Sequence, residues 1–175
     1  LVLLMLPRVG VMTWKDVQSR IPWGTVIVFG VGISLGTALL TTQAGQWLGN
    51  QVVAHTGLDH LGPLAIFAIL AAFLIVIHLG FASATALTSA MLPILISVLA
   101  TLPGDFSRLG MTMLLGFVVS YGFILPINAP QNMVCLGTET FNAKQFAKVG
   151  IIVTIVGYLL MLVMGATYWR WLGWL

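Results

Sequence analysis

Long apolar runs separated by short polar stretches dominate the chain. Residues 22–41 and residues 61–104 contain no charged side chain. Residues 106–138 carry a single charge, on Arg108, and residues 149–169 again carry none. Because an α-helix rises about 1.5 Å per residue, about 20 apolar residues cross the core of a bilayer. The pattern therefore predicts membrane-spanning helices, with 22–41 and 149–169 as one span each.

Two of these runs, residues 61–103 and 106–138, are too long for single helices at ordinary tilt. The first contains small and hydroxyl residues near its middle, and these favour a break between two arms: Gly80, Ser83 and Thr85. The second contains the proline-rich segment LPINAPQN, from Leu125 to Asn132. Unwound backbone at membrane depth needs protein or a cavity around it. We therefore expect a re-entrant hairpin over 61–103 and a broken transmembrane helix over 106–138.

The remaining segments complete an all-α integral membrane protein. Residues 42–60 mix apolar and polar positions, which is typical of an interfacial amphipathic helix. Residues 1–7 are short and apolar, and we interpret them as the end of a preceding helix. On this interpretation, the chain is a fragment of a longer transporter or a true half-transporter.

Composition and charge agree with this class and indicate an orientation. Hydrophobic residues make up 59% of the chain and charged residues 6%, with a mean hydropathy of +1.08. Soluble domains carry about 25% charged residues. Five of the seven Lys and Arg residues fall in the polar stretches 8–20 and 139–148. The positive-inside rule places both loops in the cytoplasm. We then expect a multi-pass protein of the cell inner (plasma) membrane with its C-terminus outside.

Several classes of function lack their residues. The sequence has no GxSxG or HExxH motif and no intramembrane carboxylate pair, so we expect neither an enzyme nor a metal site. No basic stripe for nucleic acid is present. The single cysteine, Cys135, excludes an internal disulfide. His78 is the only titratable side chain of the hairpin, and two interpretations stay open for it. We expect a neutral ring hydrogen-bonded to a carbonyl, with proton coupling as the alternative.

Two broken helical elements are typical of a secondary transporter. A helix that begins inside the membrane presents unpaired N–H groups and the positive end of its dipole, which attract anions. Helices that end there present carbonyl oxygens, which coordinate Na⁺. Hydroxyl side chains such as Ser83 and Thr85 add hydrogen bonds without a buried formal charge.

Four segments of the sequence resemble one transporter family. FASATALTSAMLP, residues 81–93, is similar to the second Ser-Asn-Thr signature of the divalent anion:sodium symporters (the DASS or INDY family). LPINAPQN resembles that family's LPxxTPPN segment. Residues 13–36 resemble its WK…WGxLLLFGGGLxL segment, and residues 147–161 resemble its last helix. The resemblance covers nearly the whole chain and corresponds to the C-terminal one of two inverted repeats.

The resemblance implies half of an inverted-repeat transporter that works as a homodimer in the lipid bilayer. It also implies a missing N-terminal half, in the same polypeptide or a partner chain. The substrate would be held by Ser83, Ala84, Thr85, Asn128, Ala129 and Pro130. The coupling ion Na⁺ would be held by Ala82, Ala84, Asn128 and Asn132, and no other cofactor is implied.

The chain departs from the family pattern at several of these positions. Ala84 stands where the signature has Asn, and Ala129 stands where TPPN has Thr. Gln131 replaces the second Pro, and Leu79 replaces a Thr that binds sodium in the family. We hypothesise that the side-chain amide of Asn128 replaces the one lost at Ala84.

The expected function is secondary active transport of a di- or tricarboxylate, or of sulfate, by alternating access. Na⁺ is the expected coupling ion, with H⁺ coupling or anion exchange as alternatives. Two other functions remain open at this point. One is a permease of the arsenite or Na⁺/H⁺ antiporter kind, and the other is a regulatory half-transporter that moves no substrate.

Overall fold

The computed structural model describes residues 13–19, 41–81 and 83–175, together with positions 23, 27, 30, 31, 34, 37 and 38. Every regular element in this part of the chain is helical, which confirms the all-α prediction. The predicted helix end at residues 1–7 lies outside the described residues. Most of the predicted span 22–41 also lies outside them.

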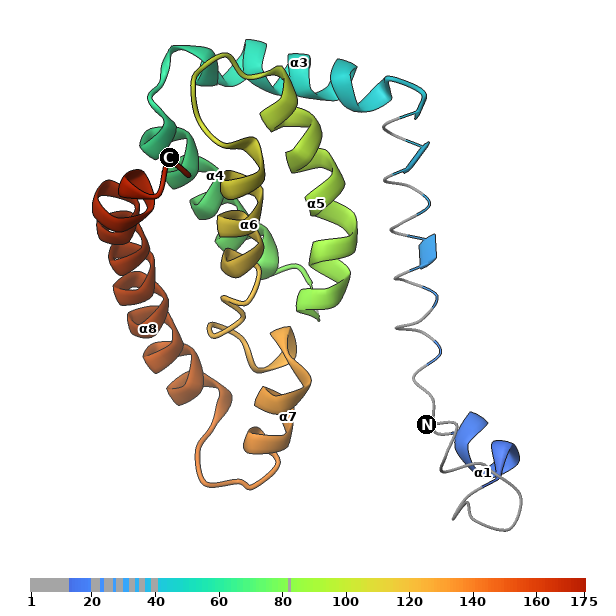
Figure 1. Cartoon of the computed structure of the whole chain (residues 1–175). Coiled ribbons are helices and arrows are strands. Elements are labelled where there is room, and N and C mark those ends of the chain that lie inside the picture. Colours follow the sequence, from blue (N-terminus) through green and yellow to red (C-terminus); the bar gives the residue numbers. More distant parts are fainter. Residues whose placement is uncertain are drawn as a thin grey trace.

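The described helices are separated by the polar stretches and the Pro- or Gly-containing breaks of the sequence. In order they are α1 (Trp14–Gln18), α3 (Ala44–Thr56), η2 (Leu58–His60), α4 (Pro63–His78), α5 (Ala84–Thr101), α6 (Arg108–Val118), η3 (Pro126–Asn128), α7 (Pro130–Leu136), α8 (Ala143–Met164) and the π-helical turn η4 (Gly165–Trp169). Figure 1 shows α4, α5, α6 and α8 side by side. Helix α3 crosses one end of this bundle, and α7 lies at the other end.

Local sequence explains where several helices begin. Pro63 occupies the first turn of α4, where a missing N–H costs nothing. The Ser107 hydroxyl accepts a hydrogen bond from Gly110 N at 3.0 Å and caps α6. Asn142 and Gln145 exchange side-chain-to-backbone hydrogen bonds of 2.9 Å and form a capping box at α8.

Helix α6 is the centre of the described core because it packs against both α4 and α5. Phe67 and Leu74 of α4 and Leu87 of α5 are fully buried. Met111 and Leu114 of α6 are also 0% exposed and fill the space between these helices. The two arms of the predicted hairpin therefore share α6 as a common packing partner.

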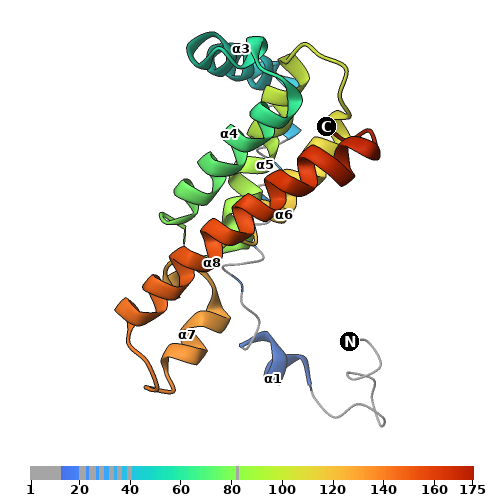
Figure 2. The same cartoon turned by 90° about the vertical axis from the view of Figure 1, so that its left-hand side faces the viewer.

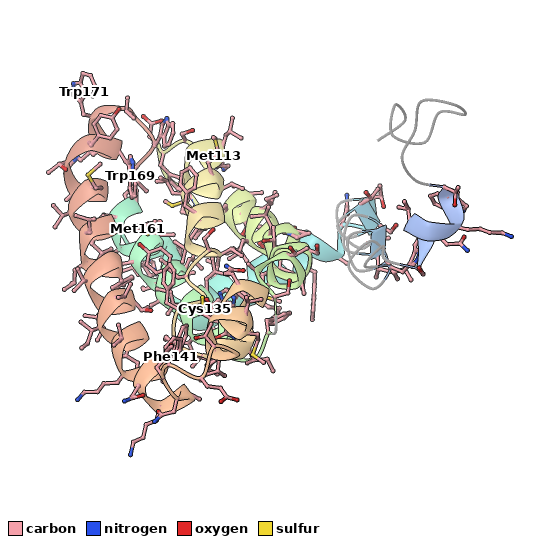
Figure 3. All side chains as sticks on the ribbon, turned by 90° about the horizontal axis from the view of Figure 1, so that it is seen from below. Met113, Cys135, Phe141, Met161, Trp169 and Trp171 are labelled. Carbon is pink, nitrogen blue, oxygen red and sulfur yellow. The ribbon has the colours of Figure 1, made fainter. Side chains whose placement is uncertain are left out.

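Helix α8 lies alongside α4 (Figure 2). The Tyr158 hydroxyl donates a hydrogen bond to the Ala68 carbonyl at 2.9 Å and ties the two helices together. Near the end of α8, Met161 and Trp169 point toward the other helices, whereas Trp171 points away (Figure 3). The Trp169 ring meets Phe67 edge-on at 5.9 Å.

Helix α3 approaches α5 closely at Gly49. A Cβ added there would lie 2.8 Å from the Ser97 carbonyl oxygen and 3.0 Å from the Thr101 hydroxyl. Only glycine allows this approach. The contact places α3 across the end of the bundle (Figure 1).

The outer faces of the bundle are apolar, as expected for helices in lipid. Within the described residues, α5 and the continuous helix Ala143–Trp169 are long and apolar enough to cross a membrane. Helices α4 and α6 are apolar but shorter. Large exposed side chains along α8 include Ile152, Val156 and Val163. Contiguous apolar surface of this kind is rare on a soluble monomer.

Candidate functional site

The first candidate site feature is the break between α4 and α5. Helix α4 ends at His78, and three consecutive turn hydrogen bonds close the chain, with Phe81 N donating to the His78 carbonyl at 3.0 Å. The backbone is then extended at Ser83, which is the N-cap of α5. The Ser83 side chain makes no capping hydrogen bond, so its hydroxyl is not used by the helix. The 18-residue α5 thus begins directly after the break, among small and hydroxyl residues.

The second feature is the break between α6 and α7. Helix α6 ends at Val118, and the chain continues without regular structure to the short turn η3, Pro126–Asn128. Ala129 is the N-cap of α7, whose first residue is Pro130. The Asn132 side-chain amide donates to the Gly122 carbonyl at 2.8 Å. This bond holds the beginning of α7 against the unwound segment.

The Asn128 side chain joins the two breaks. Its amide nitrogen donates to the carbonyls of His78 at 2.7 Å and Phe81 at 2.8 Å. Its amide oxygen accepts from Leu125 N at 3.1 Å. Asn128 is 1% exposed, so both amide hydrogens are used by buried or partly buried main-chain carbonyls. We call this set of three hydrogen bonds the Asn128 clamp, and we call the region in which it joins the two breaks the junction.

The His78 ring lies inside the same junction. It is 1% exposed, and neither ring nitrogen has a hydrogen-bond partner. The expectation of a ring bonded to a carbonyl is therefore wrong: it is the backbone carbonyl of His78 that is bonded, to Asn128. The ring packs on Gly122, where an added Cβ would lie 3.0 Å from Cε1 and 3.1 Å from Nε2.

The predicted site residues are divided between the two breaks. Ser83, Ala84 and Thr85 form the beginning of α5 and are partly buried. Ala129 is buried before α7, and Pro130 opens that helix. Asn132 lies inside α7 and is not a helix cap. Ala82 lies outside the described residues. The Asn128 clamp brings the second group to Phe81, two residues before Ser83.

Sequence reasoning missed Gly122. This residue provides the carbonyl for Asn132 and the flat surface on which the His78 ring packs. A lone glycine after Tyr121 has no distinguishing signal in a single sequence, because its role depends on a side chain 44 positions away (residue 122 against residue 78).

The electrostatics of the junction are simple. Among residues 61–107 and 109–138, His78 is the only Lys, Arg or His. Arg108 lies at the other end of α5, where its guanidinium donates to the carbonyls of Leu99 and Leu102. In the described part of the chain, no group of three potential metal-ligating side chains occurs. The polar groups of the junction are therefore backbone N–H and carbonyl groups, hydroxyls, side-chain amides and one imidazole.

Comparison with known proteins decides the family. The model of the sodium:sulfate symporter transmembrane region matches residues 1–175. The chain belongs to this family. The family consists of membrane transporters, which confirms the multi-pass membrane class, the resemblance and the expectation that the chain is not an enzyme.

Individual relatives show how much of a family member the chain represents. A protein described as "Membrane protein" in Cupriavidus necator is 75% identical over 99% of this chain, which covers 34% of that relative. Human solute carrier family 13 member 4 is 31% identical over 87% of this chain and is 24% covered. Mouse Na(+)/dicarboxylate cotransporter 3 is 27% identical over 86% of this chain and is also 24% covered. The chain spans about a quarter to a third of the length of these relatives.

Proposed function

We propose that this chain is the C-terminal repeat of a secondary active transporter for small divalent or trivalent anions, with Na⁺ as the coupling ion. The substrates are di- or tricarboxylates, or sulfate. The observation that carries the proposal is the Asn128 clamp, because it joins two interrupted helices into one junction. Broken helices of this kind form substrate sites at the midplane in inverted-repeat transporters.

The anion is proposed to bind at the beginning of α5. The first N–H groups of a helix have no acceptor within it, and the helix dipole adds a partial positive charge there. Ser83 and Thr85 add hydroxyl donors, and no acidic side chain occurs among residues 61–104 to repel an anion. The carbonyl groups around Ala82 and Ala84, with the amides of Asn128 and Asn132, are the proposed Na⁺ ligands.

In this conformation both hydrogens of the Asn128 amide are bonded to carbonyls. Asn128 can therefore donate to substrate only in a conformation in which the clamp has opened. We propose that residues 61–103 form a re-entrant hairpin whose tip moves relative to the unwound segment during alternating access.

The remaining parts of the proposal concern the complete transporter. It requires an N-terminal half, supplied by the same polypeptide or a partner chain, and it works as a homodimer. It lies in the cell inner (plasma) membrane, with the C-terminus of this chain outside. The five Lys and Arg residues of the stretches 8–20 and 139–148 support this orientation.

Uptake by the complete protein in proteoliposomes tests the proposal. Labelled succinate, citrate and sulfate are offered with Na⁺ or with K⁺ in its place. We expect at least one anion to accumulate only with Na⁺. Transport at the same rate in K⁺ would remove sodium coupling, and no uptake of any anion under any gradient would refute the transport function.

Two threonines of the same helix provide a matched pair of variants. Thr85→Val removes the proposed substrate hydroxyl without changing side-chain shape. Thr88→Val removes a hydroxyl that already donates to the Ala84 carbonyl at 2.8 Å. We expect Thr85→Val to raise KM by about tenfold, because a charge-assisted hydrogen bond contributes roughly 1.5–3 kcal/mol. Equal KM values for both variants would remove Thr85 from the site.

A further inference from the structure

His78 combines three properties that no other described residue shares. It is 1% exposed, both ring nitrogens lack a hydrogen-bond partner, and it lies where the hairpin tip meets the unwound segment. A buried polar group without a partner costs about 1–3 kcal/mol, so native structures rarely retain one without a function. A packing role alone would be filled by Leu or Phe at no such cost.

We propose that His78 is a proton-coupling residue of the transporter, and that it takes up a proton when the Asn128 clamp opens. This inference rests on the proposed transport function. In the closed clamp the imidazole packs on Gly122 and is 1% exposed, and no acceptor is bonded to either nitrogen. An imidazolium has two N–H donors to satisfy and a charge to solvate, and in the closed junction neither ring nitrogen makes a hydrogen bond.

The geometry links protonation to movement of the tip. Asn128 donates to the carbonyl of His78 itself. One residue therefore carries both the acceptor of a clamp bond and the enclosed ring. Separating the hairpin tip from residues 122–128 breaks both Asn128 donor bonds and uncovers the ring. A proton that binds only the open form shifts the equilibrium toward that form.

The position of His78 also explains why a proton would travel with the anion. His78 lies five positions before Ser83, the N-cap of α5, where the anion is proposed to bind. A protonated imidazole there supplies the single positive side-chain charge that residues 61–107 and 109–138 can provide. The predicted process is therefore symport: the proton enters from outside on a ring nitrogen and leaves to the cytoplasm when the clamp closes again.

Other titratable groups around this junction do not compete for the role. Neither α4 nor α5 contains another one. The titratable and charged groups of α6, α7, α8 and the segment 119–129 are Arg108, Tyr121, Cys135, Lys144, Lys148 and Tyr158. Arg108 is bonded to the far end of α5, and Tyr158 donates to the Ala68 carbonyl. Cys135, Lys144 and Lys148 are exposed, and the Tyr121 ring contacts Gly157 and Phe123.

The test uses the complete protein in proteoliposomes with the membrane voltage clamped to zero. Labelled succinate uptake is measured with about pH 7.5 inside and either about pH 7.5 or about pH 6 outside, which spans the ordinary titration range of imidazole. Wild type is compared with His78→Gln and His78→Asn, and His60→Gln is the matched control because the His60 side chain is 84% exposed. Succinate protonation is the same for every protein, so differences between proteins isolate the histidine.

We expect the acidic outside to stimulate wild-type and His60→Gln uptake by roughly fivefold or more, the lower end of ordinary coupling between two ligands. Both His78 variants should lose this stimulation, and their succinate exchange at equal pH should keep its maximal rate with a raised KM, because the imidazole charge beside the anion is lost. A wild-type uptake rate that is the same with and without the pH gradient would overturn the proposal. Stimulation of His78→Gln by the acidic outside to the wild-type extent would also overturn it. Loss of both stimulation and exchange in monodisperse His78 variants would show a structural role and also overturn it.

Failure of the transport function itself looks different. In that case wild type takes up no anion under any ionic condition, including equal pH with Na⁺. If wild type accumulates succinate with Na⁺ at a rate that does not depend on the pH gradient, only the role of His78 is refuted.

Discussion

The side-chain amide of Asn128 donates a 2.7 Å hydrogen bond to the backbone carbonyl of His78, fifty positions earlier in the chain. The same amide bonds the Phe81 carbonyl and accepts from Leu125 N. One side chain therefore bonds three main-chain groups at the two breaks, in addition to the turn bond that the His78 carbonyl accepts from Phe81 N. The following predictions test how much of the junction depends on this arrangement.

Asn128→Ala should destabilise the junction and abolish uptake. The change leaves the carbonyls of His78 and Phe81 and the N–H of Leu125 without this partner. The His78 carbonyl keeps its bond from Phe81 N, so we expect the free energy of unfolding to fall by about 1–3 kcal/mol for each of the other two groups that is left buried and unpaired. Thermal unfolding in detergent measures the loss of stability, and proteoliposome uptake measures the loss of transport.

Gln131→Ala is the control for this prediction, because Gln131 is exposed three residues further on. It should keep both stability and uptake. Wild-type transport by Asn128→Ala would contradict both the clamp and the hypothesis that Asn128 replaces the amide lost at Ala84.

Gly122→Ala should disturb the packing of the His78 ring. The new methyl group would lie 3.0 Å from Cε1 of His78 and 3.3 Å from Cβ of Asn128, and both neighbours are themselves buried. Overpacking of this kind costs about 1–3 kcal/mol. Gly116→Ala is the matched control, because a Cβ there meets nothing within 4 Å. If the two variants unfold at the same temperature, the close approach at Gly122 is not a constraint on stability.

Tyr158→Phe should loosen the contact between α8 and α4. It removes the 2.9 Å hydrogen bond to the Ala68 carbonyl and leaves the ring in place. The expected loss is about 0.5–1.5 kcal/mol in the free energy of unfolding, the usual net contribution of one hydrogen bond. Tyr168→Phe, at an exposed position, should leave the unfolding temperature unchanged. A larger effect from Tyr168→Phe than from Tyr158→Phe would contradict this role.

The junction also shows which site residues a sequence can reveal. Ser83, Thr85 and the segment 125–132 are marked by residue type, because hydroxyls and prolines inside apolar runs are locally unusual. Gly122 carries no such mark, since glycines are common throughout this chain, with 19 in total. The pairing of Asn128 with the His78 and Phe81 carbonyls depends on how two helical elements pack, and no local pattern specifies it.

The sequence by itself determined the helical membrane class, and the family comparison confirmed the transporter resemblance carried by its short motifs. These are properties of runs of neighbouring residues: apolar length, charge spacing, and proline or glycine interruptions. Only the tertiary structure decided which hydrogen-bond partners the polar groups at these interruptions have. Buried polar groups must find partners wherever packing places them, and here Asn128 meets two carbonyls while the His78 ring meets none. Such pairings are set by the docking of distant segments, which a single sequence does not encode locally.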